Sequence, residues 1–558
     1  MNKIFLSFVV SGSLLASNYK LVPLSADGVA LSSSNLAKSF SADAAFINPA
    51  NMGFLGQNPQ LHFSANYYNI TGSRFKNHLT EVGGEPYYNA SDAHGKEFSF
   101  FLPTIALVYP INEQHFIGFS GYTDFAGVYG WNSDYAKALT DTMDIRGGTL
   151  ALSYAFKPTS ELSLGAAITA NHTRLKFNLL KDNAKNPRYI PNDPTEMNKV
   201  WIDNEGKAHP YSWVYSGNVK ADNGYKFGYK LSLTYAPKYF EEKLKFSLLY
   251  NSSYNNNFKG DMEFKMSKFA MFDFVSQDSA QKSLQDGKTE QEKIAMIIGM
   301  GALTSEIYKL GQNGIEIDSN TQLPIPLSSQ NDKVGYSGFV SANFLYPANA
   351  NFGIAYEYGK HEFMFNMGRT FWSKSKSLDL KINAPEVPEA LKNAAIKFMQ
   401  TCQSAPDKCS SDDAKQQVAM GIGAMLKPEE KQAIEEYFFA SVLQASLEQG
   451  WKDTTLLSFG YRYNYDKELS LMLGFSTEDS PVRREKISFL AKDSRMYNYS
   501  LGFEYRINKQ LKVTGAGAYQ HYADVKVDNI TDNILIQTKG KFSNQSNQIV
   551  NVGINYEF

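Results

Sequence analysis

The C-terminal stretch Ile549-Val550-Asn551-Val552-Gly553-Ile554-Asn555-Tyr556-Glu557-Phe558 alternates between two kinds of residue. Every second residue from Val550 to Phe558 is apolar or aromatic, and the residues between them are polar or glycine. Successive side chains of a β-strand point to opposite faces, so this stretch has one apolar and one polar face. That division is typical of a strand with lipid on one side and a polar lumen on the other.

The same alternation recurs along the chain. Clear examples are 225–235 and 497–506, where Tyr, Phe and Leu alternate with Lys, Gly, Ser, Asn or charged residues. Further runs lie near 60–71, 97–109, 115–128, 147–157, 161–176, 243–258, 335–358, 361–382, 453–464, 467–477 and 510–525. There are about fourteen, an even number, as closure with both termini on one side of a membrane requires.

Short and long connections alternate between these runs. The short ones include 111–114, 157–161, 358–361 and 508–510, whereas the long polar ones lie near 177–223, 259–334 and 384–450. We therefore predict an all-β fold, a transmembrane antiparallel β-barrel of about 14 strands over 60–558, with the long loops extracellular. A soluble sandwich is disfavoured, because neither strand face reads as a dry core.

Two long loops contain helical patterns rich in Met, Gly, Ala and Ile, one at 293–303 and the other at 417–426 followed by 434–447. We expect helical extracellular loops. These helices either pack on each other over the barrel mouth or offer an adaptable apolar surface to a lipid-like ligand.

The composition agrees with a membrane barrel. Charged residues make up 20% and aromatic residues 14%, with 34 Tyr and 38 Phe, and the mean hydropathy is −0.36. No run of about 20 apolar residues is present, which excludes a helical membrane protein. The net charge of −1 gives no reason to expect nucleic acid as a partner.

The N-terminal residues divide into two segments. Residues 1–17 read as a signal peptide, with Lys3 before apolar residues and a cleavage site near Ala16 or Ser17. Residues 18–59 are Ala-rich and polar and do not alternate like a strand. We expect this segment to form an N-terminal hatch, a plug inside the lumen.

Several short motifs occur in order along the chain. They are Asn48-Pro49-Ala50 before Met52-Gly53-Phe54-Leu55, the stretch 102–109, Tyr346-Pro347-Ala348, Phe371-Trp372-Ser373, Trp451-Lys452-Asp453, Ser480-Pro481-Val482 and the stretch 499–505. In this order the chain resembles the FadL-type family of outer-membrane transporters for long-chain fatty acids and other hydrophobic compounds. The long loops at 259–334 and 384–450 depart from the family pattern.

The resemblance implies a monomeric barrel in the cell outer membrane that works by passive diffusion. Apolar loops would capture the ligand, a lumenal pocket would receive it, and movement of the hatch would release it sideways through a gap at a kinked third strand. We therefore expect transport of hydrophobic small molecules, most of all long-chain fatty acids, with no cofactor. The alternative is a porin or surface adhesin, and a porin would lack the hatch.

The resemblance also directs attention to particular residues. Asn48, Pro49 and Ala50 match the hatch motif, although the same triplet can form an ordinary turn. Gly118, Gly121 and Gly127 lie in the predicted third strand and mark either the lateral opening or a barrel corner. Tyr19 and Leu21 would lie near the ligand pocket unless the mature terminus is disordered.

Cationic side chains inside the barrel are candidates for binding a carboxylate. Lys226 and Lys230 have inward parity in their strand, as does Arg462, although lumenal cations can equally be solvated or pair with Glu504. Arg174 and Lys176 share parity with Leu164 and Ile168, so we expect them outside near the rim, where lipopolysaccharide phosphates lie.

Nothing in the sequence indicates an enzyme or a metal site. The eight His residues are scattered and have no nucleophile motif beside them. Cys402 and Cys409 have no His nearby, and in an exported protein we expect them to form a disulfide.

Overall fold

The structure is a computed structural model of the chain. It describes residues 25–558 except 83–84, 87–91, 124, 133–140, 180–199, 203–207, 211–214, 268–297, 299–314, 318–323, 327–332, 376, 383–386, 434–436, 438–444, 449, 488, 490–491 and 531–535. The proposed signal peptide and the candidates Tyr19 and Leu21 lie outside the described residues.

The wall is a closed antiparallel barrel of fourteen strands, some of which are interrupted and carry two labels, so the predicted fold class is confirmed. In chain order the strands are β1 (Gln60–Thr71), β5 (Phe98–Pro110), β6 with β7 (His115–Tyr122, Ala126–Gly130), β8 (Thr142–Phe156), β9 (Leu162–Leu179), β12 (Tyr215–Tyr235), β13 with β14 (Leu244–Asn251, Tyr254–Ser267), β17 with β18 (Lys333–Tyr346, Asn349–Tyr358), β19 with β20 (His361–Thr370, Ser377–Ile382), β21 with β22 (Ala445–Glu448, Thr454–Asn464), β23 (Leu469–Glu478), β24 (Met496–Arg506), β25 (Leu511–Tyr522) and β28 (Ser546–Glu557). The barrel closes where β1 pairs with β28, from Gln60 opposite Glu557 to Thr71 opposite Ser546.

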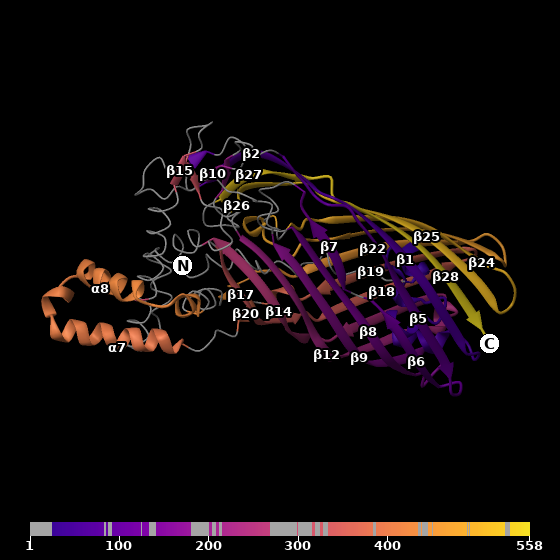
Figure 1. Cartoon of the computed structure of the whole chain (residues 1–558). Coiled ribbons are helices and arrows are strands. Elements are labelled where there is room, and N and C mark those ends of the chain that lie inside the picture. Colours follow the sequence, from indigo (N-terminus) through magenta and orange to yellow (C-terminus); the bar gives the residue numbers. More distant parts are fainter. Residues whose placement is uncertain are drawn as a thin grey trace.

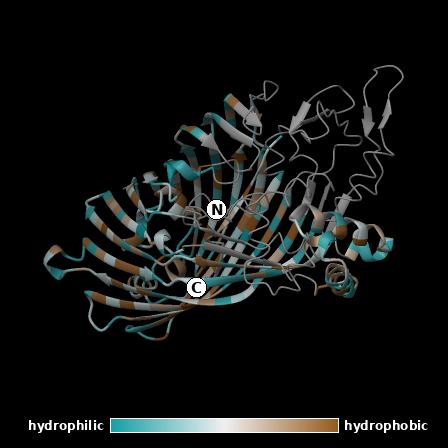
Figure 2. Cartoon of the chain, turned by 90° about the vertical axis from the view of Figure 1, so that its left-hand side faces the viewer, coloured by the Kyte–Doolittle hydropathy of each residue, from teal (hydrophilic) through white to brown (hydrophobic). Residues whose placement is uncertain are grey.

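The alternation of the C-terminal strand has the predicted orientation. Val550, Val552 and Ile554 are 45–55% exposed on the outside, whereas Asn551 and Asn555 are buried inside. Brown and teal segments alternate along the strands in Figure 2. With lipid outside, the exposed apolar side chains are in their preferred medium.

The two ends of the barrel differ, as expected. Short turns and the C terminus lie at one end, and helices α7 (Glu389–Ser404) and α8 (Asp412–Ala424) lie at the other (Figure 1). Small sheets lie at the same end as these helices. They are formed by β2 (Arg74–Val82), β3 (Glu85–Pro86), β4 (Ala93–His94), β26 (Val525–Ile530) and β27 (Ile536–Ser543), by β10 (Val200–Ile202) with β11 (Ala208–Pro210), and by β15 (Ile315–Ile317) with β16 (Pro324–Pro326). None of the described helices has the length and apolarity needed to cross a membrane.

Strands extend further than the sequence pattern predicts. β9 continues to Leu179, β12 begins at Tyr215 and β14 runs to Ser267, within segments expected to be loops. The lipid-facing alternation ends below these extensions, because their outer residues, such as Lys220 and Asp261, are charged. The ladder nevertheless goes on, since backbone hydrogen bonds do not require an apolar face.

The helical loop at 384–450 contains α7, the 3-10 turn η10 (Pro406–Cys409) and α8. A disulfide joins Cys402 to Cys409, with the two Cα atoms 5.5 Å apart. Leu391, Ala394, Ala395 and Phe398 form the buried side of α7. The predicted helical stretch at 293–303 lies outside the described residues except for Ile298. The predicted helix at 434–447 is wrong at its end, because the chain forms strand β21 from Ala445 onward.

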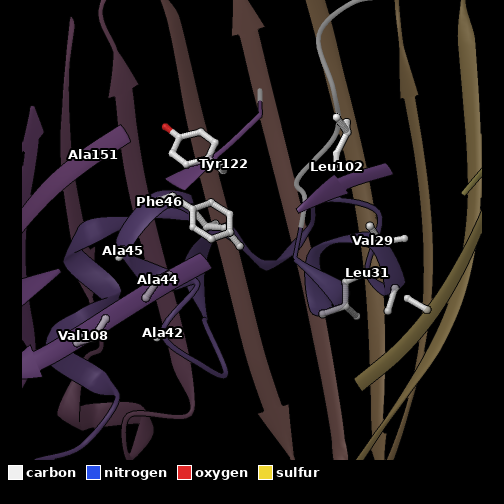
Figure 3. Close-up of a cluster of buried hydrophobic side chains, with 14 of the residues drawn as sticks. Val29, Leu31, Ala42, Ala44, Ala45, Phe46, Leu102, Val108, Tyr122 and Ala151 are labelled. Atoms are coloured by element: carbon white, nitrogen blue, oxygen red, sulfur yellow. The ribbon is translucent and has the colours of Figure 1, made fainter. Parts of the chain in front are cut away.

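Inside the barrel lies a compact segment, called the hatch below, with α1 (Ala26–Ala30), η4 (Asn35–Ala37), α2 (Ala44–Ile47) and η5 (Pro49–Phe54). Side chains from separate parts of the wall donate to its carbonyl oxygens: Ser153 to Ala45, Asn366 to Ser33 and Ser500 to Ala30, at 2.6–3.1 Å. Only a segment within the lumen can contact β8, β19 and β24 together. Figure 3 shows its apolar residues against the inner wall.

Candidate functional site

The Asn48-Pro49-Ala50 triplet holds the hatch against the wall. Asn48 caps η5 by accepting from the Ala50 amide (3.2 Å) and donates to the Leu36 carbonyl (2.8 Å) and to Thr234 Oγ1 of β12 (3.2 Å). Pro49 starts the turn, where its missing N–H has no cost. The Ala50 amide also donates to Ser232 Oγ at 3.0 Å. The triplet therefore fixes both a local turn and its docking on β12.

The wall is shaped for this turn at Gly165 of β9. A Cβ at this position would lie 2.2 Å from the Ala50 nitrogen and 2.7 Å from the Pro49 carbonyl carbon. The backbone of the hatch thus approaches the backbone of the wall more closely than a side chain at position 165 would permit. The alternating pattern of 161–176 does not by itself distinguish this glycine from others.

An ion-pair cluster, called the charged pad below, holds another part of the hatch. Lys38 of the hatch lies 2.5 Å from Glu357 and 2.8 Å from Glu362. Arg462 lies 2.9 Å from Glu504, and its guanidinium stacks over the ring of Phe40 in the hatch at 4.1 Å. The sequence indicated Arg462 and Glu504 as inward partners, but Lys38 and Phe40 precede the strands and carry no periodic signal.

Lys230 contacts the hatch, as its inward parity allows. Its Nζ donates to the Phe46 carbonyl at 2.7 Å and lies 4.9 Å from the centroid of the Tyr122 ring. Lys226 lies four residues before Lys230 on β12, and its carbonyl accepts from the Asn171 amide at 3.1 Å. Of the two predicted lysines, Lys230 is the one that borders the cavity described next.

A cavity of about 180 Å³ lies between the hatch and the wall. Its apolar lining includes Leu36, Phe46 and Ile47 of the hatch with Leu249 and Leu456 of the wall. Its polar lining includes the charged side chains of Lys230 and Glu478 and the amides of Asn171, Asn251, Asn349, Asn351 and Asn366. Of these residues, the sequence indicated only Lys230, although inward asparagines on adjacent strands are a pattern that could have identified the others.

The third strand is interrupted beside this cavity. β6 ends at Tyr122 and β7 begins at Ala126. β5 pairs with β6 only from Ile105 opposite Gly121 to Pro110 opposite Phe116, whereas residues 98–104 of β5 pair on their other side, with β1. We call this break in the wall, between 98–104 of β5 and 122–126, the window.

The three predicted glycines lie near the window, but none of them lies within the interruption itself. Gly121 and Gly127 flank the interruption. Gly118 faces inward, and a Cβ there would lie 2.9 Å from Ala45 Cβ and 2.7 Å from Met52 Sδ, so it makes room for the hatch. Tyr122, at the end of β6, stacks on Phe46 of the hatch with ring centroids 5.0 Å apart (Figure 3).

The described residues contain no group of three or more His, Cys, Asp or Glu side chains arranged to hold a metal ion. Among the described residues, the site brings together a cavity with apolar, asparagine and charged lining (Lys230 and Glu478), a docked hatch and a break in the wall. This arrangement defines the class as a plugged outer-membrane channel rather than an open pore.

Comparison with known proteins identifies the family. The family model described as outer membrane protein transport protein (OMPP1/FadL/TodX) matches residues 7–558, and the chain belongs to this family. It is thus an outer-membrane protein that transports hydrophobic compounds, and the family consists of transport proteins rather than enzymes. No curated protein sequence matches the chain.

Solved structures share the fold at low identity. A FadL homologue of Pseudomonas aeruginosa is 17% identical with a TM-score of 0.62, covering 97% of this chain and 99% of that chain. The Pseudomonas putida toluene transporter TodX is 13% identical with a TM-score of 0.54, covering 95% and 98%. CymD, a monoaromatic hydrocarbon channel, is 13% identical with a TM-score of 0.51, covering 97% and 99%.

Proposed function

We propose that this protein admits long-chain fatty acids by passive diffusion, with gating by the hatch and lateral exit through the window. The observation that supports this most is the cavity, which places Lys230 beside the apolar hatch residues Leu36, Phe46 and Ile47. A fatty acid needs both surfaces, because its carboxylate seeks a cation while each buried CH₂ gains about 0.8 kcal/mol.

Binding of a carboxylate would act directly on the hatch. Lys230 now donates to the Phe46 carbonyl, so an arriving carboxylate competes for the same ammonium. Phe46 also stacks on Tyr122 at the edge of the window. Withdrawal of Lys230 therefore weakens the contacts that keep α2 between the cavity and the window, which couples ligand binding to opening of the path.

A monoaromatic hydrocarbon is the second candidate, and the volume of the cavity favours it. At about 180 Å³ the cavity is similar in size to an engineered apolar cavity of about 150 Å³ that binds benzene. The rings of Tyr122, Tyr229, Tyr254 and Tyr346 contribute to its lining. Such a ligand has no carboxylate and would not need Lys230.

The substitution Lys230→Gln distinguishes the two candidates. We expect uptake of radiolabelled palmitate into cells to fall roughly tenfold, the value of one charge-assisted hydrogen bond of about 1.4 kcal/mol, while uptake of toluene is unchanged. Lys226→Gln, two inward positions away on the same strand, is the control and should leave both rates unchanged. Equal palmitate uptake by the Lys230→Gln and unmodified proteins would exclude carboxylate recognition at this lysine.

Lateral exit has a test of its own. Deleting residues 123–125 would join β6 to β7 and close the window, and we expect palmitate uptake to fall to the level of cells without the protein. Deleting Gly224, which lies at a bulge of β12 and does not line the cavity, is the control for a shortened strand. Undiminished uptake after the first deletion would show that the ligand leaves by another route.

A further inference from the structure

Two carboxyl groups of the hatch are fully buried in the lumen. Asp27 of α1 and Asp43, which precedes α2, both have an exposed fraction of 0%. Among the described residues, no group donates a hydrogen bond to either side-chain oxygen of Asp27, and the side chain of Asp43 does not cap α2. A buried carboxylate with so few partners is costly in its ionised form, which favours the protonated form.

The cations of the wall on this side of the hatch are already paired with a glutamate. Arg462 lies 2.9 Å from Glu504 of β24, and Lys512 of β25 lies 3.9 Å from the same carboxylate. Within the part of the chain that the structure describes, no Lys, Arg or His nitrogen lies within 4.0 Å of Asp27 or Asp43. Glu504 itself faces Asp27 and adds repulsion between like charges.

Carboxylates outnumber cations where the hatch meets this part of the wall. Lys38 is shared by Glu357 and Glu362, so it is not available to the two aspartates. The carboxylates of the region are Asp27, Asp43, Glu357, Glu362 and Glu504, and the cations are Lys38, Arg462 and Lys512. A docked hatch with all of these groups ionised would therefore hold uncompensated negative charge, and protons on the two aspartates remove it.

The remaining titratable groups that face the two aspartates have other partners. His62 of β1 faces Asp27, but its ring is hydrogen-bonded to Asn555 at 2.5 Å and to Ser64 at 3.1 Å. At the far end of α2 from Asp43, Tyr122 of β6 stacks on Phe46 and Lys230 of β12 donates to the Phe46 carbonyl.

We propose that Asp27 and Asp43 make docking of the hatch depend on protons: their protonated forms hold the hatch in the lumen, and loss of the protons favours its release. Ionised Asp27 would lie beside the Glu504 carboxylate in an interior of low dielectric constant, where like charges repel strongly. This dependence concerns docking of the hatch, whichever ligand is transported.

The direction of the pH effect follows from burial. Burial raises the pKa of Asp27 to about 7, and Glu504 and Asp43 act in the same direction. Burial also raises the pKa of Asp43 to about 6, although hydrogen bonds from Ser25 and Ser41 act in the opposite direction. In a released hatch both carboxyls meet water, where the ordinary pKa is 3.8. The docked state therefore binds more protons, and its stabilisation is fully present below about pH 4 and lost as the pH rises through about 6 and 7.

Hydrogen exchange of the full-length protein in detergent, followed by mass spectrometry at about pH 5 and about pH 8, tests this. The test variant Asp27→Asn/Asp43→Asn keeps the shape of both side chains but cannot ionise. Exchange of hatch peptides is compared between the unmodified protein and the variant at the same pH, so that the intrinsic pH dependence of amide exchange cancels. The control variant is Glu113→Gln/Glu468→Gln, which removes two exposed carboxylates from turns.

We expect hatch peptides of the unmodified protein to exchange about as fast as those of the test variant at pH 5 and roughly tenfold faster or more at pH 8, because each such proton can change the docking equilibrium about tenfold per pH unit. The control variant should behave like the unmodified protein, and β28 peptides should show no difference. If the double variant fails to fold, Asp27→Asn alone should still reduce the pH effect roughly threefold or more. A ratio that is the same at both pH values, or a test variant that follows the control, would overturn the proposal.

Discussion

At the scale of single residues, the hatch is held by side chains whose hydrogen bonds join segments far apart in the chain. Asn48 is fully buried and connects its own turn to Leu36 and to Thr234 of the wall. The buried Asn48 amide therefore satisfies backbone hydrogen-bonding groups and also fixes where the hatch docks on the wall.

The substitution Asn48→Ala should loosen the hatch. It leaves the Leu36 carbonyl without this partner and removes the cap from the Ala50 amide, at a cost of about 2 kcal/mol to hatch docking. We expect hydrogen exchange of hatch amides to become roughly thirtyfold faster, because about 1.4 kcal/mol corresponds to tenfold.

Uptake of palmitate should fall in the same variant, since a misplaced hatch no longer shapes the cavity. The control is Asn58→Ala, which removes an exposed hydrogen bond to Glu557 at 2.8 Å and should change neither measurement. Unchanged exchange in Asn48→Ala would show that Pro49 and the Ser232 contact suffice to hold the turn.

At the scale of elements, the hatch and the wall meet through the charged pad. Lys38 and its two carboxylates are largely buried, with side chains 16%, 36% and 8% exposed. Removing one partner of a buried ion pair leaves the other charge uncompensated, which typically costs about 3 kcal/mol. The charged pad therefore attaches the end of η4 to β18 and β19 through ion pairs.

Replacement of Lys38 by Met should weaken the attachment of the hatch to the wall. Both native cysteines are in the disulfide, so a cysteine introduced at the buried Ser41 is the one free thiol of the chain. We expect its labelling by a maleimide to be at least tenfold faster with Lys38→Met than without it. Lys243→Met, which removes an exposed pair with Glu241, is the control. Equal labelling in all three proteins would mean that the pad does not restrain the hatch.

The strands were predictable because alternation is a local signal that membrane and lumen impose on every strand alike. Val550 to Phe558 shows it, and so do the inward Lys230 and Arg462. The contacts of the hatch were not predictable from pattern, because Lys38, Phe46 and Gly165 meet partners more than one hundred residues away. The interruption after Tyr122 also has no periodic signature, since glycines flank it without marking its position.

At the scale of the whole molecule, the barrel is closed independently of its plug. Its fourteen strands satisfy each other's backbone groups around the ring, and β1 with β28 completes the circle. The hatch instead contributes contacts to the inner face, many of which are polar, such as Ser153, Asn366 and Ser500. Inner positions that are polar tolerate water, so the lumen does not depend on the hatch for solvation.

Deletion of residues 25–55 should therefore leave a folded barrel that conducts water-soluble molecules. We expect the variant to keep its folded migration in unboiled gel electrophoresis and to permit swelling of proteoliposomes in a small sugar, whereas the complete protein permits none. Uptake of palmitate should lose its dependence on Lys230, because that lysine would no longer have the Phe46 carbonyl to release. A folded variant that still excludes the sugar would place a second barrier in the extracellular part of the molecule, and gating by the hatch alone would then be wrong.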